Sequence, residues 1–224
     1  MCGKFTQMAT WAEVVAFSQP LGGWRPEDEP FVTATPMRFA RIIRLDAEGK
    51  RENVAMRWGF ADKGAANPAR PKHMHARCET IDTRPTFRDA FQNARGILLV
   101  GTFNEGEALP SGKTKQWTIT PKNHLPIAIA VICEEWRHEE ETLWTFVQVT
   151  TPANVLISPV TDRMPAILQQ EDWVTWLGET DASLHEVKAL LKTFEDEGAW
   201  DIAPQQTPPK SPKPAKTKEQ EGLF

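Results

Sequence analysis

The pattern of apolar and polar positions along the chain predicts a protein built mainly from strands. Runs rich in β-branched and aromatic residues, some alternating with polar positions, are typical of strands rather than long helices. These runs lie at residues 38–45, 53–60, 97–100, 116–120, 127–133 and 143–150. Because they do not alternate regularly with long helices, the pattern favours an α+β fold. We expect one domain on a curved, mainly antiparallel sheet or barrel with flanking short helices.

Three short helices are predicted around these strands. Thr10 and Glu13 have the spacing of a capping box, which would open a helix through about residue 17. Ser183 and Glu186 repeat the same signal before a run with apolar residues on one helical face. Residues 171–177, followed by a glycine, form the third candidate.

The composition changes near residue 202, which we take as the end of the folded domain. The chain has 224 residues, 40% of them hydrophobic, so residues 1–202 can bury one good core. Residues 203–219 are rich in proline and lysine and show no apolar periodicity, which predicts a disordered, extended linker. Residues 220–224 end the chain on two apolar side chains and form a separate short segment.

The charge and the cysteine count narrow the class of protein. The formal net charge is −4, so the protein does not bind nucleic acid through overall charge, and any such contact needs a local patch. Three cysteines are too few for a disulfide framework, which favours a reducing compartment. No apolar run has the length of a membrane span and no secretory signal opens the chain, so we expect a cytoplasmic protein without a membrane partner.

Cys2 is the candidate nucleophile with the most distinctive chemistry. Removal of Met1 would leave one residue with an α-amine and a thiol on adjacent carbons. The α-amine has a reference pKa of about 7.7–8.0, far below that of lysine, so a useful fraction is unprotonated at neutral pH. Such an amine condenses with an aldehyde to a Schiff base, and the thiolate then closes a five-membered thiazolidine ring. Many proteins also carry an ordinary early cysteine.

Several short motifs occur in a characteristic order along residues 1–180. They read Met1-Cys-Gly-Lys-Phe5, Ala34-Thr-Pro36, Met56-Arg-Trp-Gly-Phe60, Ala76-Arg-Cys-Glu-Thr80, Arg84-Pro-Thr-Phe87, Asn104-Glu105, Val149-Thr-Thr-Pro-Ala153 and Thr161-Asp-Arg-Met-Pro165. Together they resemble the SRAP family. The resemblance implies a sensor of abasic sites in single-stranded DNA, which forms a thiazolidine crosslink between Cys2 and the sugar aldehyde and needs no cofactor.

The resemblance also implies an acid–base residue, because the closed sugar must open before an amine can attack it. Glu105 aligns with the glutamate of the family's active site. From the residues alone, the sequence around Glu105 favours a turn residue, and Glu107 is the competitor if the register differs by two positions.

Three basic residues are candidate DNA contacts. Arg77 is the candidate phosphate clamp, since a guanidinium binds phosphate in a fork, and its structural alternative is an ion pair with Glu79. Lys4 stands where the family usually has arginine, so it keeps the charge and loses the fork. Arg163 serves either DNA or internal structure.

Two positions depart from the family pattern. The family's active-site asparagine is His75 here, and its histidine is Thr161, which cannot transfer protons near neutral pH. One hypothesis is that His75 takes over part of the acid–base work, because an imidazole titrates near pH 6.5. The alternative is a slower protein, or one that binds without efficient crosslinking. His73, His75 and Cys78 match no standard zinc spacing, so no metal is expected.

The tail suggests a second route to DNA. Members of the family often carry tryptophans after the Trp-Gly motif that stack on bases, and residues 61–68 contain no aromatic here. Gln220, Leu223 and Phe224 resemble the Gln-x-x-Leu-Phe peptide that bacterial replication proteins insert into the sliding clamp. On a long linker, such a peptide would raise the local concentration of the domain at a replication fork. The alternative is an ordinary frayed end.

Three functional classes therefore stay open from the sequence. The first is a DNA-damage enzyme that crosslinks abasic sites and is tethered to the clamp. The second is a weakened binder or adaptor that shields such DNA or recruits a partner. The third is a cysteine peptidase, the activity from which the family takes its name.

Overall fold

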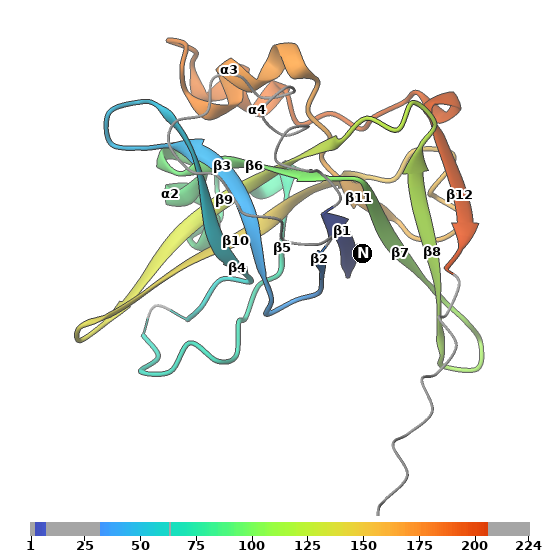
Figure 1. The fold of residues 1–224 in the computed structure, drawn as a ribbon, viewed down its shortest axis with the longest axis horizontal. Helices are drawn as coiled ribbons and strands as arrows, with labels where there is room; N and C mark the ends of the chain where they lie inside the picture. The colour runs from blue at the N-terminus through green and yellow to red at the C-terminus, as the bar shows by residue number, and fades with distance from the viewer. Residues whose placement is uncertain (1–2, 8–31, 63, 206–224) are drawn as a thin grey trace, which may run out of the picture.

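A computed structural model describes residues 3–7, 32–62 and 64–205 of the chain. Four predictions fall wholly or mostly outside these residues: the helix from residue 10, the nucleophile Cys2, the linker 203–219 and the segment 220–224. The described part contains twelve strands and several short helices, arranged as Figure 1 shows. The elements are β1 (Lys4–Gln7), β2 (Val32–Ala34), β3 (Phe39–Leu45), β4 (Arg51–Trp58), β5 (His75–Arg77), η1 (Cys78–Thr80), α2 (Pro85–Asn93), β6 (Arg95–Val100), β7 (Thr102–Ala108), β8 (Thr114–Pro121), β9 (Ile127–His138), β10 (Glu141–Pro152), β11 (Arg163–Pro165), η2 (Gln170–Asp172), α3 (Trp173–Leu177), α4 (Leu184–Ala189), η3 (Glu197–Ala199) and β12 (Trp200–Pro204).

The strands form a small barrel with a second sheet beside it. Strand pairing runs from β10 through β4, β3, β6 and β9 and back to β10, which closes a ring of five strands. Strands β5 and β11 extend this sheet from β10. The second sheet has the order β12-β8-β7-β1-β2. Every pairing is antiparallel except those of β10 with β4 and β5, which confirms the predicted curved, mainly antiparallel architecture.

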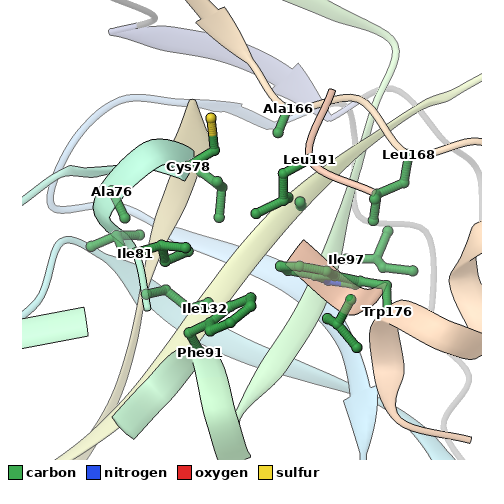
Figure 2. Packing of buried hydrophobic residues seen from close by; sticks show 14 of the residues in the cluster. Ala76, Cys78, Ile81, Phe91, Ile97, Ile132, Ala166, Leu168, Trp176 and Leu191 are labelled. Atoms are coloured by element: carbon green, nitrogen blue, oxygen red, sulfur yellow. The ribbon is translucent and has the colours of Figure 1, made fainter. Parts of the chain in front are cut away.

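Alternation along the barrel strands divides the buried residues into two clusters. On one face of β6 and β9, Ile97 and Ile132 pack against the helices through Phe91 and Trp176, as Figure 2 shows. The opposite face belongs to a second cluster that continues into the smaller sheet through Phe5 and other apolar residues. Short helices on the outside therefore cover the barrel, while the amino-terminal strand joins the inner cluster.

The sequence predicted most of these elements correctly and missed some. All six predicted strand runs overlap observed strands, and the capping box of Ser183 and Glu186 is formed at the start of α4. The predicted helix before Gly178 is α3, preceded by the turn η2. Helix α2, strand β7 and the short strands β1, β2, β5, β11 and β12 were not predicted. Strand β12 runs to Pro204, past the boundary predicted at residue 202, because it pairs with β8 along the edge of the smaller sheet.

Candidate active site

Glu105 lies beside the amino-terminal strand. Strand β1 runs between β2 and β7, and Lys4 is the register partner of Asn104 on β7. The Asn104 side-chain amide is buried and donates to Thr118 Oγ1 at 2.7 Å and to the Trp117 carbonyl at 3.2 Å. These bonds fix β7 against β8. Glu105, the next residue on β7, is therefore held next to the start of β1. Strand β1 begins at Lys4, two residues after Cys2 in the chain.

The carboxyl group of Glu105 is fully buried, with 0% of the residue exposed. Burial raises its pKa to about 7, and the negative charge of Asp162 acts in the same direction. Near neutral pH both protonation states are populated, so the group can donate a proton or accept one. Glu107, the alternative candidate, is half-buried and accepts a hydrogen bond from Trp117 Nε1 at 2.8 Å. The geometry therefore favours Glu105 over Glu107 for acid–base work.

His75 begins β5 and contacts the aromatic residues of the inner cluster. Its ring meets the buried Trp58 edge-on at a centroid distance of 5.7 Å. Gly59, the residue after Trp58, has φ +110° and no room for a Cβ, which would lie 2.7 Å from Pro71 Cβ. Only glycine lets the chain turn there and bring the segment before β5 back over Trp58.

An aromatic path connects the His75 side of the site to the Glu105 side. Phe5 on β1 lies 5.1 Å from Trp58, measured between ring centroids. Phe5 is also the register partner of Phe103, which shares a face of β7 with Glu105. The sequence segments that carry His75 and Glu105 thus meet across the first residues of β1.

Thr161 is adjacent in the chain to Asp162, whose charge acts on Glu105. Its hydroxyl lies 3.5 Å from Asp162 Oδ1, and Asp162 is the residue whose charge acts on Glu105. Thr161 is half-buried, in the turn before β11. Thr161 is therefore linked to Glu105 only through the charge of Asp162, and His75 is linked to β1 through Trp58 and Phe5.

Arg163 is engaged inside the protein. Its residue exposure is 7%, and its guanidinium donates to both Glu79 carboxylate oxygens, at 2.5 and 2.9 Å, and to the Thr150 carbonyl at 2.6 Å. The Arg163 bond lowers the pKa of Glu79 to about 2. Of the two roles considered for Arg163, this geometry supports the internal one, because its fork is already filled by a carboxylate.

Arg77 and Lys4, the other two predicted DNA contacts, differ in exposure. Arg77 ends β5 and is exposed. Glu79, proposed as its structural partner, binds Arg163 instead. Lys4 is half-buried on β1. Among the residues that the structure describes, no group of three or more His, Cys, Asp or Glu side chains could hold a metal ion.

Two residues of the site were missed by the sequence analysis. Trp117, half-buried on β8, is the register partner of Glu105, and its ring has Lys115 Nζ 4.0 Å from the centroid. Gln148 on β10 is fully buried and is the register partner of His75. The signal for Gln148 was a polar amide inside the apolar run 143–150, where a buried strand normally carries apolar side chains.

The fold and the site define a single-domain α+β protein with a buried acid beside its amino-terminal strand. The family model described as SOS response associated peptidase (SRAP) matches residues 1–206. The chain belongs to the SRAP family, and its fold confirms the resemblance carried by the short motifs. The tryptophans Trp58, Trp173 and Trp176 are all buried.

Curated relatives match over nearly the whole chain. The abasic site processing protein YoqW of Bacillus subtilis (strain 168) is 26% identical over 219 residues, covering 96% of this chain and 97% of the relative. A protein of the same name from Bacillus phage SPbeta matches equally. The abasic site processing protein YoaM of Bacillus subtilis is 27% identical and covers 87% of each chain.

Solved structures show the same fold. A protein from Bacteroides thetaiotaomicron superposes with a TM-score of 0.74 at 24% identity, covering 92% of both chains. A protein from Bordetella bronchiseptica gives a TM-score of 0.74 at 20% identity, covering 92% of this chain and all of that one. None of the helices that the structure describes is both long and apolar enough to span a membrane.

Proposed function

We propose that this protein processes abasic sites in single-stranded DNA by forming a covalent thiazolidine with the sugar aldehyde through Cys2, after removal of Met1. The observation that carries the proposal is the position of Glu105, a buried acid with a pKa of about 7, beside the strand that follows Cys2. Two peptide units separate Cys2 from Lys4, so its Cα lies within about 7.6 Å of the Lys4 Cα. The names of the curated relatives support the same substrate class.

The chemistry assigns a distinct task to each group. The α-amine of Cys2 adds to the aldehyde carbon, and loss of one water molecule gives an imine. The Cys2 thiol then adds across the imine: sulfur bonds to carbon and nitrogen takes the proton, which closes the ring. Glu105 donates the proton that lets the sugar open and the water leave. In this proposal His75 and Thr161 contribute to the acid–base environment of Glu105, with His75 assigned part of the proton transfer because an imidazole has a reference pKa near neutral pH.

Binding of the DNA strand falls to Arg77 and Lys4 in this proposal. Arg77 is exposed and presents a guanidinium that holds a phosphate in a fork. Lys4 adds a charge next to the reacting residue, without the geometry of a fork. Phosphate contacts position a strand without reading its sequence, which suits a protein that must find a lesion in any context.

The tail would bring the domain to replicating DNA. Gln220, Leu223 and Phe224 form the proposed sliding-clamp peptide, and residues 205–219 separate it from β12. A peptide on a tether of that length raises the effective concentration of the domain near the clamp without any further contact.

The test is a denaturing gel of the protein mixed with single-stranded DNA that carries one abasic site, after mass measurement has confirmed loss of Met1. We expect a slow band for the wild type, none for Cys2→Ala, and a slower appearance for Glu105→Gln. A wild type without Met1 that gives no such band would contradict crosslinking and favour the binder or adaptor. Thiol-dependent peptide cleavage by protein with an acetylated α-amine would instead favour the peptidase.

A further inference from the structure

Gln148 is a buried side chain whose amide makes no hydrogen bond to any residue that the structure describes. It is 0% exposed, and neither Oε1 nor Nε2 has a hydrogen-bond partner in the described part of the chain. An amide without partners in the interior is destabilising, and such groups are uncommon in native proteins. Where one persists, a partner from outside the fold is the simplest physical reason for keeping it.

Gln148 lies on the same face of the sheet as His75 of the proposed active site. Gln148 and His75 are register partners on the parallel strands β10 and β5, so their side chains leave the sheet on the same face. Phe146, two residues earlier on β10, also shares that face and stacks on Trp58 at 6.3 Å. His75 meets the same Trp58 ring. The Gln148 amide therefore lies on the site face of β10, beside the histidine.

The size and chemistry of the amide restrict its partner. It offers two N–H donors and one carbonyl acceptor, so it suits a hydroxyl group, which both donates and accepts. An abasic sugar without its base carries hydroxyl groups in the space that a nucleotide with an intact base would fill. A strand with intact bases offers no such group at the lesion position.

We propose that Gln148 is a binding residue of the lesion pocket and that it recognises a hydroxyl group of the base-free deoxyribose. This inference rests on the proposed function and adds a contact that selects the damaged sugar over an intact nucleotide. A site built to hydrogen-bond a hydroxyl rejects a ligand that lacks it, because the buried polar group is then left without a partner.

The test uses two probes that cannot crosslink because they contain no aldehyde. One is a single strand with a chemically reduced abasic site, which keeps the sugar hydroxyls. The other has a tetrahydrofuran at the same position, which lacks the hydroxyl at the base-free carbon. We expect the wild type to bind the reduced strand about three- to tenfold more tightly, as one net hydrogen bond allows. Gln148→Met should bind both strands equally and have an unchanged or higher Tm.

Thr151→Val is the matched control on the same strand. Thr151 is also 0% exposed, its hydroxyl has no partner among the described residues, and strand alternation places it on the opposite face from Gln148. It should keep the preference for the reduced strand. An undiminished preference in Gln148→Met, or an equal loss in Thr151→Val, would overturn the inference. So would a fall in Tm for Gln148→Met, since that would indicate a structural role.

A crosslinking assay with a natural abasic site separates this inference from the proposed function. A wild type that prefers the reduced strand and never crosslinks would disprove the proposed function while the Gln148 contact stands. A wild type that crosslinks, but shows no preference that depends on Gln148, would disprove the contact alone.

Discussion

The guanidinium of Arg163 and the carboxylate of Glu79 form a two-bond fork that joins β11 to η1. Arg163 also donates to the Thr150 carbonyl on β10, so one side chain connects three segments that are distant in sequence. The residue before Arg163 is Asp162, whose charge acts on Glu105. The ion pair thus fixes the turn that sets part of the electrostatic environment of the buried acid.

Arg163→Lys should destabilise the protein, because lysine keeps the charge and cannot fill the fork. A single lysine ammonium would then have to serve both the Glu79 carboxylate and the Thr150 carbonyl. We expect this change to lower the free energy of unfolding by about 1–3 kcal/mol. Thermal or urea unfolding measures it. Arg77→Lys is the matched control on an exposed arginine, and it should leave the Tm unchanged. Equal Tm losses in the two variants would contradict the internal role of Arg163.

Glu105→Gln should stabilise the protein, increasingly so toward alkaline pH. The folded pKa of Glu105 is about 7, raised from a reference of 4.5, so the folded state favours the protonated carboxyl. Stability from that preference is present below pH 4.5 and is lost as the pH rises to about 7, where the buried charge must form. Glutamine removes the loss, which reaches roughly 3 kcal/mol above pH 7. Unfolding measured across pH 4–9 should show this widening gap.

Glu107→Gln provides the comparison for that titration. Glu107 lies two residues along β7, is half-buried and accepts from Trp117 Nε1, a bond that a glutamine oxygen can still make. We expect no gain that grows with pH. A pH-independent difference for Glu105→Gln would show that the carboxyl is not the group that titrates.

The barrel was predictable because its strands obey alternation and are rich in β-branched residues, as at 127–133. Strand β7 was missed because Asn104, Glu105 and Glu107 are polar, so the segment lacks the apolar pattern of a strand. Such disagreement between the local sequence pattern and the fold is expected where function requires polar side chains in a strand. Helix α2 carried usable signals, with Pro85 in its first turn and apolar residues on one face.

The candidate site was predictable only in part. Glu105 and His75 could be identified from the sequence because they lie within the short motifs that carry the resemblance to the family. The pairing of Arg163 with Glu79 instead depends on how β11 packs beside η1, which spacing along the chain does not indicate. Gln148 became informative only once the structure placed it beside His75 and showed that its amide has no partner in the described residues.

His75→Asn tests whether the imidazole transfers protons. If His75 shares the acid–base work, the variant should crosslink more slowly, and the pH–rate profile should change shape. Single-turnover crosslinking from pH 5 to 9 measures both. The variant also loses the edge-on contact with Trp58, so its Tm should be measured alongside. An unchanged rate and profile would remove His75 from the mechanism.

Trp117 offers the flat surface that the segment after Trp58 lacks. Its indole is fixed by the bond to Glu107 and has Lys115 over one side of the ring, directly across from Glu105 on the neighbouring strand. A rigid indole at this place suits stacking on a base next to the lesion. Stacking of this kind contributes about 1–3 kcal/mol per base, so Trp117→Ala should weaken binding to undamaged single-stranded DNA about tenfold.

Trp144→Ala is the matched control for Trp117→Ala. Trp144 also carries a cation over its ring, with Arg44 at 3.9 Å from the centroid, and it lies on β10, in a different sheet from β7 and β8. Fluorescence anisotropy of a labelled strand should show the loss for Trp117→Ala alone. Similar losses for both variants would mean that the effect comes from general destabilisation.

The terminal peptide makes a prediction that does not depend on the chemistry of Cys2. Leu223 and Phe224 are apolar residues at the end of a polar tail, and a clamp pocket would bury both while Gln220 sets the register. The full chain should therefore bind a purified bacterial sliding clamp, and Leu223→Ala with Phe224→Ala should abolish that binding. Crosslinking of naked abasic DNA should be unaffected by the double change, because these residues lie beyond the linker. Failure of the intact protein to bind a clamp would leave the tail without this role, and an equal loss of crosslinking would show that the tail belongs to the catalytic domain.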